Sequence, residues 1–268
     1  DLFEARAVAL RRCFLSGLPE QIGQCCRLRL LDLNTCQLKM LPDSIGQLVS
    51  LRTLLLTYNH LHVLPDTFGR LSALEGLNLT HNRLVCLPDT FSALLNLQEF
   101  NCSHNQLLAL PWNFGGLTAL QKLDLSDNQL NALPDAFCEL SSLQCLWLGD
   151  NLIAELPEAF GKLVTLEKLS LFKNRLTCLP ESFVYLRSLK KLTLSGNQLT
   201  SVPAQVYNSE GLTILHLENN RHLLDVRVAL RRAARACAAP LKRFGWPWHM
   251  CLRRRGVQET GEHLANLL

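Results

Sequence analysis

Residues 51–73 read LRTLLLTYNHLHVLPDTFGRLSA, and the outline of this stretch recurs every 23 residues along most of the chain. A proline ladder runs from Pro19 to Pro203 at this period, and an Ile/Phe ladder runs from Ile22 to Val206. A third ladder carries asparagine, with cysteine at its first two positions: Cys13, Cys36, Asn59, Asn82, Asn105, Asn128, Asn151, Asn174, Asn197 and Asn220. The three ladders stay in phase, which predicts one structural unit stacked repeatedly rather than a globular domain.

Each repeat contains a short apolar segment that we expect to be a strand, such as residues 54–56. Stacked copies would pair in parallel, with Leu54 and Leu56 pointing inward and Leu55 pointing outward. Asn59 follows at the turn off the strand. A buried amide there can donate to and accept from the backbone of neighbouring turns, whose polar groups would otherwise be left without partners.

The return segment of each repeat begins at a proline such as Pro65. Its fixed φ suits the first turn of a short helix, and the acidic residue that follows, here Asp66, favours that helix N-terminus. Phe68 would then fill the outer layer of the core. We therefore predict an α/β fold, a curved right-handed solenoid with a parallel concave sheet and short helices or 3-10 turns on the convex side. Strands are expected near residues 31–33, 54–56 and 77–79 and every 23 residues onward, about ten in all, over roughly 45 Å at ~4.8 Å per strand.

The phrase LPxxFxxLxxLxxLxLxxNxL occurs as LPDSIGQLVSLRTLLLTYNHL at 41–61 and as LPDAFCELSSLQCLWLGDNLI at 133–153. It resembles the intracellular leucine-rich repeat proteins, and most of all the group of plant Ras-group-related proteins, Scribble-type polarity scaffolds and the Ras–phosphatase scaffold. The resemblance covers residues 8–220. It implies an adaptor that holds a protein on its concave face, in some members a small GTPase of the Ras type with a phosphatase subunit. The chain has no basic-Val-x-Phe stretch of the kind that docks that phosphatase.

The chain divides into residues 1–220, the solenoid of about ten turns, and residues 221–268, a helical C-terminal cap with a basic aromatic tail. The second part carries ten Lys/Arg against three Asp/Glu, a net charge of +7, which leaves −3 for residues 1–220. We expect a capping helix with a solvated charged face, because a solenoid must cover its last apolar face. The alternative is a contact with an anionic membrane surface or an acidic partner, and nucleic acid is the least favoured partner. The residues for such a contact are Arg227, Arg231, Arg235, Trp246, Trp248, Arg253, Arg254 and Arg255.

The chain has 11 cysteines, without the spaced terminal clusters that close secreted proteins of this repeat type. Free thiols in a reducing compartment are therefore expected, which favours a cytoplasmic location. No signal peptide is visible, and no apolar run approaches the ~18 residues that span a bilayer.

The residues that point into the concavity should carry the function. Nothing in the repeat requires Trp147, and we expect Phe172, one repeat further on, to form one aromatic patch with it. Lysines border this patch on one side and acidic residues on the other, as in a protein-binding hot spot. The predicted protein-binding residues are Leu55, Tyr58, His81, Glu99, His104, Asp124, Asp127, Trp147, Asp150, Lys168, Phe172 and Lys173.

Enzymatic function is not indicated. The sequence has no GxGxxG, GxxxxGK[ST], HExxH or CxxC motif. His81, His104, Asp127 and Asp150 could hold a metal or act with Ser103 or Ser126, but an open sheet has no walls that exclude water. We therefore expect solvated polar residues, no cofactor and no metal, in a non-enzymatic scaffold.

Overall fold

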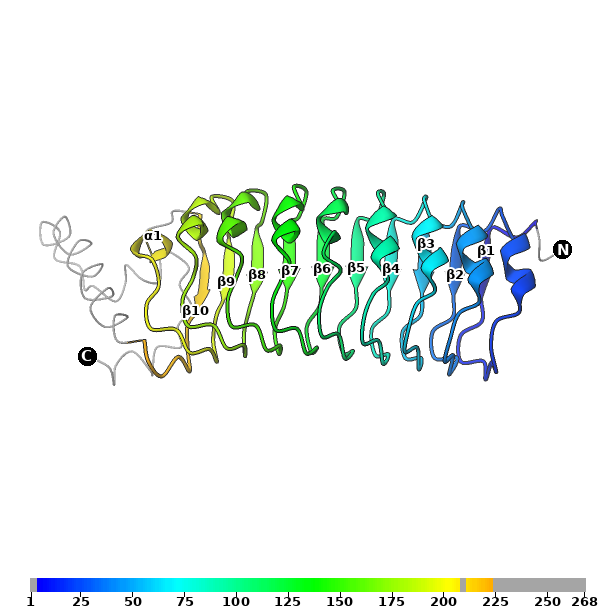
Figure 1. Cartoon of the computed structure of the whole chain (residues 1–268), viewed down its shortest axis with the longest axis horizontal. Coiled ribbons are helices and arrows are strands. Elements are labelled where there is room, and N and C mark those ends of the chain that lie inside the picture. The colour runs from blue at the N-terminus through cyan, green and yellow to red at the C-terminus, as the bar shows by residue number, and fades with distance from the viewer. Residues whose placement is uncertain (1–3, 208–210, 224–268) are drawn as a thin grey trace, which may run out of the picture.

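The computed structural model describes residues 4–207 and 211–223, which form a stack of repeats with one continuous sheet. All ten strands are parallel and follow one another in chain order (Figure 1). The register is constant, since each residue of a strand pairs with the residue 23 positions later. The strands are β1 (Ala7–Ala9), β2 (Leu30–Asp32), β3 (Thr53–Leu55), β4 (Gly76–Asn78), β5 (Glu99–Asn101), β6 (Lys122–Asp124), β7 (Cys145–Trp147), β8 (Lys168–Ser170), β9 (Lys191–Thr193) and β10 (Ile214–His216).

A short helical turn lies between each pair of consecutive strands, and all but the last are 3-10 turns. The predicted solenoid of parallel strands and short convex turns is therefore confirmed. The turns are η2 (Glu20–Gln24), η3 (Asp43–Gln47), η4 (Asp66–Arg70), η5 (Asp89–Ala93), η6 (Phe114–Gly116), η7 (Asp135–Glu139), η8 (Glu158–Lys162), η9 (Glu181–Tyr185) and α1 (Ala204–Tyr207). No helix within 4–207 and 211–223 has the length and hydropathy needed to cross a membrane.

Two local expectations are displaced by one residue. Strand β3 is Thr53–Leu55 rather than 54–56, because the amides of Arg52 and Thr53 both donate to the Arg29 carbonyl and so start the pairing earlier. Pro65 precedes η4 instead of occupying its first turn. Its backbone is extended, with φ −67° and ψ 151°, and its carbonyl accepts the first 3-10 hydrogen bond from the Phe68 amide at 2.9 Å.

The core is made of the predicted inward ladders. Leu54 and Leu56 are fully buried, while Leu55 between them is partly exposed, as the alternation of strand faces requires. On the other side of the core, Phe68, Phe91 and Phe114 stack ring upon ring with centroids 6.2 and 6.3 Å apart. Each repeat, or rung of the stack, thus packs against its neighbours through equivalent side chains. Stability is therefore distributed along the stack.

The asparagine ladder is buried and joins each turn to the previous one, as predicted. The Asn128 amide nitrogen donates to the carbonyls of Cys102 and Leu125 at 3.0 and 3.1 Å, and its oxygen accepts from the Leu107 amide at 2.9 Å. The second cysteine of the series is bonded to this ladder as well. Asn59 accepts from the amide of Cys36, whose thiol lies 2.8 Å from the Leu10 carbonyl.

The 3-10 turns pack backbone against backbone. A β-carbon on Gly161 would lie 1.9 Å from the Ser182 carbonyl oxygen of the next turn, so only glycine allows this approach. The expected cap and basic tail at 221–268 fall almost entirely outside the described residues, which end at Leu223.

Candidate protein-binding surface

A shallow hollow of about 450 Å³ lies on the outward face of the sheet, over strands β3 to β7. Leu55 borders it on β3 and Trp147 on β7. Gly76 opens its wall, because a β-carbon there would meet nothing closer than the Thr53 hydroxyl at 4.0 Å. The remaining lining residues are Thr53, Leu77, Asn78, Glu99, Phe100, Asn101, Lys122 and Asp124. We call this feature the sheet hollow.

The sheet hollow has an apolar end at Trp147 and a charged wall. The register places Trp147 between Asp124 and Ser170, and its indole is partly buried. Glu99 and Lys122 form an ion pair at 2.6 Å across β5 and β6. The hydrogen bond that Lys122 donates to Glu99, together with the charge of Glu99, raises the pKa of Lys122, so the Lys122 ammonium is charged at neutral pH. The hollow therefore offers an aromatic anchor beside fixed charges of both signs.

Phe172 lies apart from this hollow, and the expected aromatic patch with Trp147 is not formed by ring contact among the described aromatic side chains. Its ring lies over the α-carbon of Gly149, where a β-carbon would be 2.0 Å from a ring atom. The signal was present in the sequence, since the rungs before Gly149 carry hydroxyl residues such as Ser103 and Ser126 at that position. A missing side chain on one rung makes room for a large ring from the next. Lys173 lies over the Phe172 ring, with its ammonium 5.7 Å from the centroid.

Six of the predicted residues form a continuous row just after the strands, which we call the edge ladder: Tyr58, His81, His104, Asp127, Asp150 and Lys173. The first three rings stack, with centroid distances of 4.3 Å and 4.2 Å. His104 then lies 3.6 Å from the Asp127 carboxylate, and Lys173 pairs with Asp150 at 3.1 Å. The side chains thus contact one another from Tyr58 to Asp127, and again between Asp150 and Lys173.

The backbone of the edge ladder is left-handed at every rung, with φ between 50° and 56° from Tyr58 to Lys173. Tyrosine, histidine and lysine rarely adopt this region, so sequence reasoning did not anticipate it. The cause lies in the turn itself rather than in the asparagine, because Arg12 and Thr35, which precede Cys13 and Cys36, have the same left-handed φ of 59° and 60°. The residue at this place must take the conformation that the turn requires.

His81 is held in its neutral form. Burial lowers its pKa first, the neighbouring His104 lowers it further, and Asp127 opposes the effect. A neutral imidazole allows close stacking between two histidines without charge repulsion. The edge ladder therefore presents a flat, largely uncharged aromatic end and an ionic end.

The residues that could have suggested catalysis have structural partners instead. The Ser103 hydroxyl is buried and donates to the Asn101 side chain at 2.8 Å rather than to a histidine. Within 4–207 and 211–223, no group of three His, Cys, Asp or Glu side chains is placed to hold a metal ion. Lys168 lies on β8 in register with Cys145 and Lys191, beyond the sheet hollow.

Comparison with protein families matches the repeats directly. One leucine-rich repeat model matches residues 61–107, 111–153 and 156–199, and a second matches residues 50–71. The chain belongs to the leucine-rich repeat family. Comparison with curated proteins gives no match.

Many solved structures resemble this leucine-rich repeat chain. A leucine-rich repeat protein of Leptospira interrogans is 31% identical, with a TM-score of 0.69 over 77% of this chain and 58% of that one. The ectodomain of the Arabidopsis thaliana receptor kinase GASSHO1/SCHENGEN3, solved in complex with CASPARIAN STRIP INTEGRITY FACTOR 2, is also 31% identical, with a TM-score of 0.70 over 75% of this chain and 25% of that one. A chain of the Drosophila Toll–Spatzle complex is 26% identical, with a TM-score of 0.72 over 84% and 32%.

The leucine-rich repeat chain spans less than two thirds of each of these relatives. Relatives solved in complexes hold protein or peptide ligands, and repeat domains of this class are generally protein-binding and typically non-enzymatic.

Of the predicted site, the structure brings Leu55, Glu99, Asp124 and Trp147 together at the sheet hollow. Sequence reasoning missed Lys122 and Gly76. Both stand at the first strand position of their repeats, one residue before the strand leucine, and reading that position at the 23-residue period would have found them. The tail residues from Arg227 to Arg255 lie outside the described part of the chain.

Proposed function

We propose that this leucine-rich repeat domain is a non-enzymatic scaffold of the cytoplasm that binds a folded signalling protein in the sheet hollow. The observation that carries the proposal is the hollow itself, with Leu55 and Trp147 at its two ends and the Glu99–Lys122 ion pair in its wall. A partly buried aromatic anchor bordered by charges is the composition of a binding hot spot. The edge ladder adjoins it and would contact the rim of the partner.

The class of partner follows from family resemblance and from the shape of the surface. A shallow, open hollow over five strands suits a folded protein surface rather than a small molecule, which usually needs an enclosing pocket. The resemblance to Ras-associated scaffolds favours a small GTPase. The cytoplasmic location rests on the cysteine pattern alone.

The experiment compares partner binding by alanine variants of two tryptophans, Trp147 in the sheet hollow and Trp112 outside it. Proximity labelling in cells with wild-type chain identifies partners, whose purified forms are then titrated calorimetrically against the wild type and Trp147→Ala. Truncation of a central aromatic costs at least ~2 kcal/mol of binding free energy, whereas a rim charge such as Asp150 costs less and alters mainly the association rate. The melting temperature should stay nearly unchanged, because the indole does not support the core.

Trp112 provides the matched control. It precedes η6 on the opposite surface and is 74% exposed. Trp112→Ala removes the same side chain away from the sheet hollow and should bind as the wild type does, as should Asp43→Ala on η3. Equal binding by the Trp147 and Trp112 variants would refute the sheet hollow as the site.

A second candidate rests on the net charge of +7 in residues 221–268. The tail would tether the solenoid to an anionic membrane surface or an acidic partner. Such binding should weaken steeply between about 0.05 and 0.5 M salt, whereas binding centred on Trp147 should change much less.

A further inference from the structure

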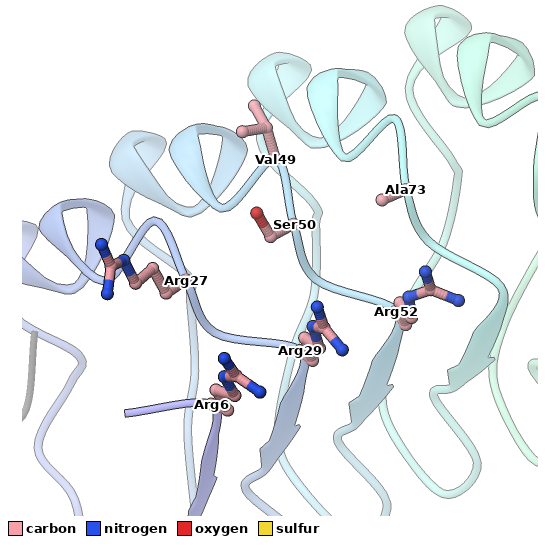
Figure 2. Close-up of a pocket in the computed structure, with 7 residues that line it drawn as sticks. All are labelled: Arg6, Arg27, Arg29, Val49, Ser50, Arg52 and Ala73. Carbon is pink, nitrogen blue, oxygen red and sulfur yellow. The ribbon is translucent and has the colours of Figure 1, made fainter. Parts of the chain in front are cut away.

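A second hollow, of about 460 Å³, lies at the N-terminal end of the sheet and is lined by four arginines. Arg6, Arg29 and Arg52 each stand immediately before a strand, at the starts of β1, β2 and β3. Figure 2 shows these three at the starts of consecutive strands, with Arg27 on the neighbouring loop. Consecutive strands are ~4.8 Å apart, so the three side chains start from neighbouring positions. We call these four residues the arginine cluster.

The same ladder position is charge-balanced further along the sheet. Lys190 pairs with Glu167 of the preceding rung at 2.8 Å, and the three rungs from Gln98 to Gln144 are neutral. At the N-terminal end, by contrast, three positive charges follow one another. Like charges side by side on neighbouring strands are destabilising. Nothing in the repeat requires arginine here, because glutamine occupies the same position elsewhere.

Two of the four arginines already have partners. Arg27 pairs with Glu4, and Arg52 pairs with Glu75 at 2.7 Å. Within residues 4–207 and 211–223, no carboxylate forms an ion pair with Arg6 or Arg29. Both side chains are exposed on adjacent rungs. Two guanidinium forks next to each other match the oxygens of a phosphate group, which each fork can bind through two N–H donors.

We propose that the arginine cluster binds a phosphorylated side chain of a protein partner, with the phosphate held between Arg6 and Arg29. The neighbouring Ser50 and Ala73, in the lining of the hollow, leave room for a peptide beside the phosphate. This site is distinct from the sheet hollow and does not depend on it.

The surroundings favour one phosphate over an extended polyanion. Glu4 and Glu75 bound the cluster on either side, and residues 1–220 carry a net charge of −3. A nucleic acid or an anionic bilayer would bring many negative charges against these acidic groups. A single phosphorylated residue needs only the guanidinium groups of Arg6 and Arg29, neither of which pairs with a carboxylate in the described part of the chain.

The test uses the full chain and two fluorescein-labelled pools of degenerate heptapeptides, one with phosphoserine at its centre and the other with serine. Fluorescence anisotropy at about 150 mM salt measures each affinity. The phosphoserine pool should bind the wild type at least about tenfold more tightly than the serine pool. Arg29→Glu, and separately Arg6→Glu, should remove this preference. The wild type and every variant keep the basic residues at 221–268, which can also attract a phosphate. The result is therefore the change in phosphoserine preference between each variant and the wild type.

Lys190→Glu is the matched control, since it reverses a charge at the same ladder position far from the cluster, and it should keep the phosphate preference. The melting temperature of each variant is measured as well, and it should equal that of the wild type because the substituted residues are exposed. The proposal is overturned if the wild type shows no preference, or if the preference survives in both arginine variants. It is overturned as well if vesicles with phosphatidylinositol 4,5-bisphosphate or a single-stranded oligonucleotide bind more tightly than the phosphopeptides in an Arg29-dependent manner.

Discussion

The asparagine ladder and the edge ladder are adjacent in sequence, yet they differ in burial and in the residue types that they accept. Asn128 and its equivalents from Asn59 to Asn197 are buried, and Asn128 bonds to backbone groups of its own turn and of the preceding one. The residue before each asparagine is more exposed and varies from tyrosine to histidine, aspartate and lysine, although every rung imposes the same left-handed backbone on it. The buried position is therefore fixed by hydrogen bonding, whereas its neighbour is open to selection for contacts with other molecules.

The largest expected effect of the contrast between buried and exposed positions is on cysteine reactivity. Burial raises the pKa of Cys138 to about 11 from 9.0, which lowers its thiolate fraction at neutral pH about a hundredfold. Native alkylation followed by mass spectrometry should label the exposed Cys26, Cys86 and Cys178 and leave Cys138 and Cys102 unlabelled until the chain unfolds. Rapid labelling of Cys102 would show that the repeats open. Stoichiometric disulfides under non-reducing conditions would contradict the proposed cytoplasmic location.

The next effect is on stability. Asn128→Ala should lower the free energy of unfolding by ~1–3 kcal/mol, because buried backbone groups of two turns lose their partners. Asp127→Asn, one residue earlier on the edge ladder, keeps a side chain that tolerates the left-handed backbone and should change it by less than about 0.5 kcal/mol. Urea denaturation measures both. Equal losses for the two variants would remove the distinction between the ladders.

A smaller effect of opposite sign is expected at Thr35. This exposed, β-branched residue stands at the edge-ladder position of its rung with φ 60°, and its side chain makes no hydrogen bond within the described residues. Thr35→Gly should raise the free energy of unfolding by about 0.5–1 kcal/mol, since glycine adopts this region without strain. A loss of stability in the same denaturation experiment would show that the turn is not strained.

The contrast also explains how far the sequence could predict the structure. The strands, the turns and the buried asparagines follow from patterns that repeat every 23 residues, and their places were predicted to within one residue. The left-handed edge ladder was not, because it is imposed by the turn of each repeat and not by the types of residue that occupy it.

The candidate site was predictable only in part, for a similar reason. Trp147 stands out in its own column of residues. By contrast, the place of Phe172 depends on the missing side chain of Gly149, one repeat earlier at the same position, and the sheet hollow depends on Gly76. A hollow forms where neighbouring repeats have small side chains, and attention to large or charged residues alone overlooks such positions.

The most direct test of the proposed function fills the sheet hollow without removing any contact. The backbone of Gly76 does not require glycine, and its β-carbon position is open. Gly76→Trp should therefore fold and melt as the wild type does. Gly17→Trp is the matched control, because Gly17 is exposed, lies between β1 and η2, and has no atom within 4 Å of its β-carbon position.

The decisive measurement is calorimetric titration of the partner identified by proximity labelling into these two variants. The proposal predicts wild-type affinity for Gly17→Trp and a loss of at least about thirtyfold for Gly76→Trp, equivalent to the ~2 kcal/mol of a hot-spot residue. Wild-type affinity for a folded Gly76→Trp variant would contradict binding in the sheet hollow.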